Sequence, residues 1–271
     1  MEFKDIISIH GAPRSGTSWL GQIFDSSPEV RYKFQPLFSY AFKDRLNLQS
    51  SAKEIDEFFN EVYLKKDPFL DQEDKKEKGS YPVFEEKDEK PNFLITKMVR
   101  YHFLIPHFLS NMPSIKVIGI VRHPCGVLNS WYKAPREFRP EWDFKKEWQY
   151  APSKNQFRPE EYFGYNRWKE LTQIFLYCQE KWPEKFYLIR YEDLVENTIQ
   201  VIGEAFLFSG IEMNKQTKEF LLKSKSDHQN DEYSVYKGNK DHRDWESELD
   251  KNIIKHIYKD LAGTNMEIFL K

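Results

Sequence analysis

Short apolar segments alternate with longer amphipathic ones along most of this 271-residue chain. Four of the short segments are rich in Ile, Val, Phe and Leu and predict buried strands, at 6–9, 93–96, 116–121 and 186–190. Helical patterns lie between them, as in βαβ units with parallel strands. The pattern therefore predicts an α/β fold in which helices flank a central parallel sheet.

Apolar residues at helical spacing mark the segments between the strands. They predict helices at 17–26, 53–64, 103–111, 125–133, 160–181, 195–209, 214–223 and 247–261. No internal repeat is present, and the length suits one large α/β domain. We therefore expect a single domain over residues 1–271.

Two segments depart from this pattern. Residues 71–90 hold 13 charged residues in 20, which predicts a solvated, mobile excursion over about 65–92. The stretch at about 136–168 is rich in Trp, Tyr and Phe and is broken by prolines. Such a stretch is either a loop region that covers a ligand site or an irregular structural subdomain.

The segment 11–20 (GAPRSGTSWL) connects the first predicted strand to the first predicted helix. The N–H groups of a helix's first turn lack intrahelical partners and favour an anion. The spacing is close to that of the nucleotide-binding loop G-x-x-x-x-G-K-[ST], but Thr17 stands where the lysine belongs and the cation is Arg14. The loop therefore predicts a phosphate site and argues against an ordinary ATPase or GTPase.

A second candidate anion site lies at the end of the third predicted strand. Arg122 ends that strand, Pro124 begins the next helix, and Ser130 lies about two turns into it. A guanidinium fork and a hydroxyl can hold one phosphate together, at the sheet edge where open α/β folds bind ligands. With the first loop, this predicts two anion sites that serve one nucleotide.

These segments resemble the motifs of sulfotransferases that use 3′-phosphoadenosine 5′-phosphosulfate (PAPS). Segment 11–20 is similar to the family's 5′-phosphosulfate loop, and 122–130 has the spacing of its 3′-phosphate motif. Segment 190–194 is similar to a strand-to-helix junction of the family, and 236–238, followed by Trp245, to its C-terminal nucleotide-closing loop. The four motifs stand in the family's order across most of the chain.

The resemblance implies a P-loop-type α/β domain with long acceptor-site loops. It implies transfer of a sulfuryl group from PAPS to a hydroxyl or nitrogen of a small molecule, with release of adenosine 3′,5′-bisphosphate (PAP) and without a metal. The nucleotide-binding residues that it implies are Arg14, Ser15, Gly16, Thr17, Ser18, Trp19, Arg122, Ser130, Tyr191, Tyr236, Lys237 and Gly238. Arg14 and Lys97 are also expected to act in catalysis.

Three features resemble the carbohydrate-type and bacterial branches of the family. They are Arg14 in place of the lysine of cytosolic members and the segments 26–30 and 35–37. Within these branches the chain resembles cyanobacterial tailoring enzymes that sulfate metabolites of the saxitoxin kind. That resemblance implies a role in secondary metabolite biosynthesis.

The chain departs from the family's pattern at the catalytic base. Lys97 matches a lysine of the cytosolic members, but Val99 occupies the place of the histidine that serves them as base. Tyr236 also stands where the closing loop often has an arginine. We expect His102, a few residues beyond the second predicted strand, to act as base. The alternatives left open are His10, His242, Glu85 and Glu86.

Composition narrows the partners. A net charge of −2 argues against general nucleic-acid binding. No leader segment and no apolar run of membrane-spanning length is present, and two cysteines provide no disulfide framework, so we expect a cytoplasmic location without membrane contact. The oligomeric state stays open.

Aromatic residues beside acidic ones predict a flat, cationic or sugar-like acceptor. The acceptor site is expected to include residues 31–42, the charged excursion and the aromatic stretch, with Trp142, Trp148 and Tyr150 as the first candidates.

Two other functions remain open at this point. The first is a P-loop kinase of a nucleoside or metabolite, which shares the strand, loop and helix arrangement. The second is a non-catalytic nucleotide-binding protein that has lost its base, as Val99 allows.

Overall fold

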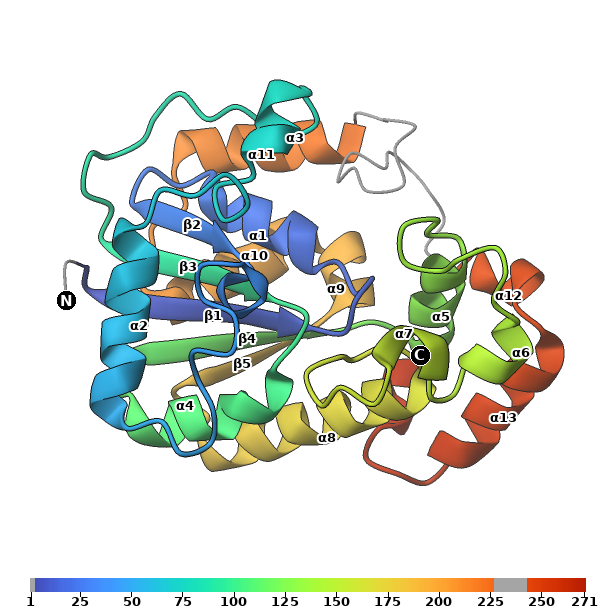
Figure 1. Ribbon diagram of the computed structural model, residues 1–271. Coiled ribbons are helices and arrows are strands. Elements are labelled where there is room, and N and C mark those ends of the chain that lie inside the picture. Colours follow the sequence, from blue (N-terminus) through green and yellow to red (C-terminus); the bar gives the residue numbers. More distant parts are fainter. Residues whose placement is uncertain (1–2, 227–242) are drawn as a thin grey trace.

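In a computed structural model that describes residues 3–226 and 243–271, five parallel strands form one sheet (Figure 1). Their order is β2-β3-β1-β4-β5. The strands are β1 (Asp5–Gly11), β2 (Val30–Phe34), β3 (Phe93–Met98), β4 (Ile115–Val121) and β5 (Phe186–Arg190). The predicted α/β fold with a central parallel sheet is therefore confirmed.

The edge strand β2 was not among the predicted strands. Its sequence, VRYKF, places Arg31 and Lys33 where a buried strand usually has apolar residues. The Arg31 guanidinium lies 4.0 Å from the centroid of the Tyr63 ring, and Lys33 Nζ donates to Asp71 Oδ1 at 2.7 Å. Both cations are thus accommodated by partners distant in the sequence, which the strand's own pattern does not reveal.

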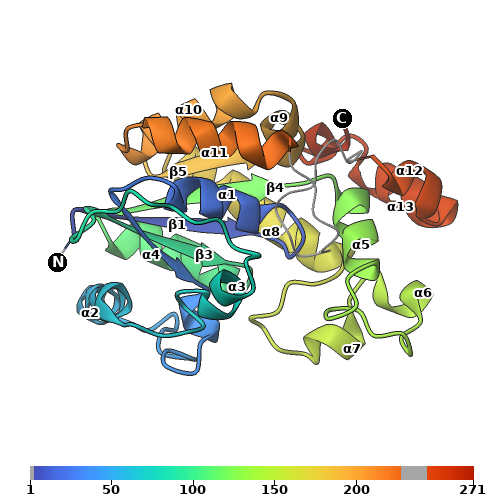
Figure 2. The same ribbon diagram turned by 90° about the horizontal axis from the view of Figure 1, so that it is seen from above.

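Helices cover both faces of the sheet (Figures 1 and 2). One face carries α1 (Thr17–Asp25), α10 (Thr198–Ser209) and α11 (Lys215–Ser226). The other carries α2 (Ala52–Leu64), α4 (Ile105–Asn111) and α8 (Tyr165–Lys181). Because side chains alternate along a strand, Ile7 and Ile9 of β1 pack into the first core and Ile6 into the second.

Short helices complete the described chain. They are α3 (Glu73–Glu77), α5 (Pro124–Tyr132), α6 (Phe144–Glu147), α7 (Pro152–Asn155), α9 (Tyr191–Glu196), α12 (Trp245–Glu248) and α13 (Lys251–Leu261), with 3₁₀ turns at Pro36–Phe38, His102–Leu104 and Glu267–Leu270. The helix expected to begin at 160 begins at Tyr165, because Gly164 turns the chain with a φ of 88°. None of the helices in the described ranges is both long and apolar enough to cross a membrane.

The carboxyl ends of the strands point toward the group formed by α5, α6, α12 and α13, whereas the N-terminus lies beyond the opposite ends (Figures 1 and 2). β1 has β3 on one side and β4 on the other. The connection after β1 leads to β2 on one side of the sheet, and the connection after β3 leads to β4 on the other. The direction of winding therefore reverses beside β1, and open parallel sheets bind ligands at such a position.

The charged excursion is attached to the body of the protein at its second half. Tyr81 is 4% exposed, and its hydroxyl donates to Asp25 Oδ2 at 2.7 Å. Lys87 Nζ donates to Asp25 Oδ1 at 2.8 Å and to the carbonyls of Ser27 and Val30. By contrast, α3 at the start of the segment buries no residue.

Candidate active site

The loop between β1 and α1 forms an uncapped helix N-terminus. α1 begins at Thr17, and its N-cap residue is Gly16, which has no side chain to cap the helix. Ser15 is fully buried, and its hydroxyl has no hydrogen-bond partner among the described residues. Free N–H groups and an unpaired hydroxyl at one helix end are the donors that an anion would satisfy.

Glycine is required at position 16 by both conformation and space. Its φ is +92°, in the left-handed region. A Cβ at this position would lie 2.7 Å from Cδ2 of Tyr191, the first residue of α9. The Tyr191 ring in turn lies under the guanidinium of Arg122, 4.7 Å from its Cζ. The junction after β5 therefore packs directly against the loop after β1.

The two predicted anion sites touch each other. Arg14 Nε donates to Ser130 Oγ at 3.1 Å, and Arg122 Nη1 donates to the Arg14 carbonyl at 3.2 Å. Arg14 itself has a φ of 74°, an uncommon backbone conformation for a residue other than glycine. The structure thus brings the loop after β1 and the Arg122–Ser130 pair to the same sheet edge.

One nitrogen of the Arg122 guanidinium can still donate a hydrogen bond. Its Nε is buried and has no hydrogen-bond partner within the described ranges. Trp168 Nε1 donates to the Arg122 carbonyl at 3.0 Å, which fixes the backbone of this residue. A Cβ at Gly126 would lie 2.9 Å from Arg122 Nε, so the glycine leaves room for the guanidinium beside α5.

Lys97 is the penultimate residue of β3 and is 4% exposed. Its ammonium lies 4.6 Å from the centroid of the Phe34 ring. Burial, aided by the nearby Lys75, lowers the pKa of Lys97 from 10.5 to about 7. Glu137 opposes this shift, whereas Arg100 and Arg14 add to it.

The geometry argues against the catalytic role expected for His102. This residue is fully buried, and its Nδ1 lies 2.9 Å from Nδ1 of His10, which is also fully buried. His10 Nε2 bonds Ser8, which bonds Thr96. Burial lowers the pKa of His102 well below its usual range. Nε2 of His102 is buried and has no hydrogen-bond partner among the described residues, so neither histidine is open to solvent.

Val99, the residue in place of the family's histidine, is 7% exposed and belongs to the apolar core. Of the other base candidates, Glu85 and Glu86 are exposed on the excursion, where the Glu86 N–H donates to Gln216 of α11. His242 lies outside the described residues.

A charged residue beside Arg14 that the sequence did not single out is Glu137, in the turn after α5. Its Oε2 lies 4.0 Å from Arg14 Nη1 and is buried without a hydrogen-bond partner among the described residues. The local sequence REFRP carries no catalytic signature, because the contact depends on a loop more than a hundred residues away.

The expected closing loop, Tyr236-Lys237-Gly238, lies outside the described residues. The segments on either side of the undescribed range both reach the site. Trp19 Nε1 donates to Ser224 Oγ at 3.2 Å, and Trp245 stacks on His123 with ring centroids 4.1 Å apart. Ser18 and Trp19 are partly exposed at the start of α1, whereas Thr17 is buried.

Beyond the end of β3, side chains from distant loops meet around Arg100. Arg100 Nε donates to Glu161 Oε1 at 2.8 Å, and Arg100 Nη1 donates to Gln35 Oε1 at 3.0 Å. The centroid of the Phe38 ring lies 3.9 Å from Cζ of the Arg100 guanidinium. Glu161 Oε2 is buried and has no hydrogen-bond partner in the described part of the chain.

Two of the three expected acceptor contacts are structural. Trp148 stacks on Tyr165, with centroids 5.9 Å apart, and contacts His256. Trp142 packs against Phe138. Tyr150, by contrast, is 67% exposed. The aromatic stretch is thus largely a packed subdomain that carries α6 and α7.

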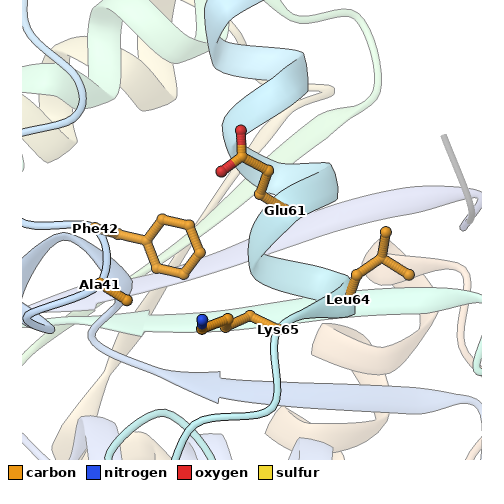
Figure 3. A pocket seen from close by; sticks show the side chains of 5 residues that line it. All are labelled: Ala41, Phe42, Glu61, Leu64 and Lys65. Carbon is orange, nitrogen blue, oxygen red and sulfur yellow. The ribbon is translucent and has the colours of Figure 1, made fainter.

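A separate surface depression lies at the end of α2 (Figure 3). It is lined by Ala41, Phe42, Glu61, Leu64 and Lys65. Glu61 accepts from Arg45 Nη2 at 3.0 Å. Ala41 and Phe42 belong to the segment 31–42 expected at the acceptor site, but none of the expected nucleotide-binding or catalytic residues lines this depression, so it is distinct from the donor site. Within 3–226 and 243–271, no three His, Cys, Asp or Glu side chains are placed to hold a metal ion.

Comparison with known proteins identifies one family for this sequence. The family model described as "Sulfotransferase family" matches residues 6–215. Carbohydrate sulfotransferase 1 of Danio rerio is 25% identical over 287 residues, covering 80% of this chain. The chain spans 65% of that relative's length.

Two solved structures share the fold. Mouse sulfotransferase SULT7A1 complexed with PAP superposes with a TM-score of 0.60 at 14% identity, covering 98% of this chain and 87% of that one. Retinol dehydratase in a complex with retinol and PAP gives a TM-score of 0.55 at 13% identity, covering 97% and 83%. At such identities the likeness concerns the fold.

Proposed function

Because the chain belongs to the sulfotransferase family, which its match over residues 6–215 establishes, we propose that it transfers a sulfuryl group from PAPS to a small-molecule acceptor and releases PAP. The observation that carries the proposal is the contact between the two anion sites. Arg14 bonds Ser130, and Arg122 bonds the Arg14 backbone. One donor with a phosphate at each end of its ribose can engage both.

The donor fits the groups that are present. The uncapped N-terminus of α1 and the unpaired Ser15 hydroxyl would hold the 5′-phosphate and the sulfate. Arg122, with its free Nε, and Ser130 would hold the 3′-phosphate. We propose Lys237 for the same phosphate, and Tyr236 and Gly238 beside it, from the resemblance of their segment.

The chemistry asks for stabilisation of charge rather than for a metal. By analogy with phosphoryl transfer, the transition state is loose and charge builds on the oxygen that bridges sulfur and phosphorus. Arg14, Lys97 and the amides of the loop would stabilise that oxygen. Preorganised donors of this kind contribute roughly 3–4 kcal/mol each to transition-state binding.

For the acceptor we propose a small molecule that binds among Gln35, Phe38, Arg100 and Glu161. The Phe38 ring and the unpaired Glu161 oxygen support a flat, cationic or sugar-like molecule. The narrower likeness to cyanobacterial tailoring enzymes, the single-domain organisation and a cytoplasmic location stay predictions from the sequence.

The test is incubation of the protein with labelled PAPS and a metabolite extract, followed by mass detection of products that have gained SO₃. We expect a labelled product and free PAP. Magnesium-dependent transfer from ATP, with none from PAPS, would refute the proposal in favour of a kinase. Tight PAP binding without turnover on any acceptor would refute it in favour of a binding protein.

A further inference from the structure

Glu137 is held rigidly at the rim of the donor site. Its N–H donates to the Ala134 carbonyl at 2.9 Å, and its own carbonyl accepts from Trp131 Nε1 at 3.2 Å. Trp131 is 1% exposed and packs between Phe138 and Phe163. The turn after α5 is therefore fixed to the core, and the Glu137 side chain extends from a rigid base.

The Glu137 carboxylate lies among cations that come from three different elements. Oε2 is 4.0 Å from Arg14 Nη1, of the loop after β1. The carboxylate also interacts electrostatically with Lys97, at the end of β3, and with Lys154 of α7. The two cations expected to stabilise the transferring group thus lie beside one carboxylate.

This carboxylate is available for proton transfer. At 4.0 Å the Arg14 contact is too long for a hydrogen bond, and no described residue bonds Oε2. The side chain as a whole is 28% exposed although Oε2 itself is buried, so the carboxylate lies at the boundary between solvent and the cluster of cations. By contrast, His10 and His102 are fully buried, and Glu161 is 5% exposed and held by Arg100.

We propose that Glu137 is the catalytic base of the transfer reaction, an inference that rests on the proposed function. The acceptor O–H gives its proton to the Glu137 carboxylate while its oxygen forms a bond to sulfur. The bond between sulfur and the bridging oxygen breaks, and PAP leaves with that electron pair. The products are a sulfate monoester, PAP and a protonated Glu137, which then releases its proton to water.

The test compares the wild type with Glu137→Gln, which keeps the shape of the side chain and removes its basicity. The probes are phenol and the more acidic 4-nitrophenol, used as surrogate acceptors in single-turnover transfer from PAPS. We expect transfer to phenol to fall by about 100-fold or more. Transfer to 4-nitrophenol should fall far less, because that acceptor gives up its proton without help. PAP affinity, measured by titration calorimetry, should stay within about threefold.

Equal losses on both phenols, or a loss of PAP affinity, would overturn the proposal and leave Glu137 as a structural partner of Arg14. Failure of the proposed function looks different, because the wild type itself would then bind no PAP or transfer to no acceptor.

The matched control is Glu141→Gln. Glu141 lies in the same segment and is 64% exposed, where it pairs with Arg139. The Glu141→Gln substitution removes one charge from the same loop at a residue that does not face Arg14. Both phenols should therefore react at the wild-type rate. Glu137→Asp should recover part of the phenol rate, because it restores a carboxylate at a shorter reach. A Glu137→Asp protein no faster than Glu137→Gln, or a Glu141→Gln protein equally impaired, would count against the base role.

Discussion

The donor side and the acceptor side of the strand ends are held together in different ways. On the donor side, short connections after β1, β4 and β5 pack directly on one another, as Gly16 does on Tyr191 and Arg14 on Ser130. On the acceptor side, long loops are joined by polar pairs between distant segments. Arg100 bonds Glu161, and the Tyr101 hydroxyl donates to Asp44 at 2.9 Å.

We therefore expect substitutions on the two sides to have different effects. On the donor side they should weaken PAP binding, because its parts are held by backbone conformation and close contact. On the acceptor side, substitution of a polar pair should leave the donor site intact.

On the donor side, the largest loss of PAP affinity is expected for Arg122→Ala. If this guanidinium holds a buried phosphate, PAP binding should weaken by about 2–5 kcal/mol, and Arg14→Ala should weaken it by a similar amount. Titration calorimetry measures the effect. Arg139→Ala, at a side chain 69% exposed, is the control and should bind PAP normally. Normal PAP binding by Arg122→Ala would separate the two anion sites.

Lys97→Met tests how much the buried Lys97 ammonium lowers the free energy of unfolding. The pKa of Lys97 is lowered to about 7, so between about pH 7 and its ordinary value of 10.5 the unfolded chain binds a proton that the folded chain does not. The free energy of unfolding of the wild type therefore rises with pH across this window. The Met variant should lack that rise and be more stable near pH 7, while losing transfer activity. Denaturant unfolding at pH 7 and pH 10 measures it; equal pH slopes in the two proteins would contradict it.

A pair of glycines separates crowding from backbone strain. Gly16 and Gly210 both have positive φ, but a Cβ at Gly210 meets nothing within 4 Å. Gly210→Ala should lower the free energy of unfolding by about 1 kcal/mol, the cost of the left-handed conformation alone. Gly16→Ala should lower it by about 2–3 kcal/mol, because its Cβ also meets Tyr191. Equal losses in chemical denaturation would mean that the Tyr191 contact yields freely.

The smallest effect is expected at the attachment of the excursion. Lys87→Met removes the bonds to Asp25, Ser27 and Val30, which should lower the free energy of unfolding by about 1–2 kcal/mol. Limited proteolysis within 65–92 should become faster, while PAP binding stays unchanged. Lys90→Met, at an exposed position of the same segment, is the control. A loss of PAP binding in Lys87→Met would show that the two sides are coupled.

The donor side was predictable from the sequence because each of its parts is local. A strand, a glycine turn and a helix start are written consecutively in 6–20, and Arg122 and Ser130 are eight positions apart. The rule that parallel strands share one carboxyl edge then brings Arg14 beside Ser130, as the structure has it. Lys237 and its neighbours stay predictions.

The acceptor side was not predictable in the same way, because its residues acquire their roles through tertiary contacts. β2 was missed because the partners of Arg31 and Lys33 come from α2 and the segment after it. His102 follows a strand at a suitable distance, yet its ring turns into the core to meet His10. Glu137 has a neighbourhood of cations that no local pattern records.

The position of β1 in the sheet has a consequence for synthesis of the chain. β1 begins at Asp5 and is made first, but its two neighbours begin only at Phe93 and Ile115. During translation both edges of the central strand therefore stay unpaired until β3 and β4 have been synthesised. We expect its exposed, Ile-rich segment to be a site where a chaperone binds the nascent chain.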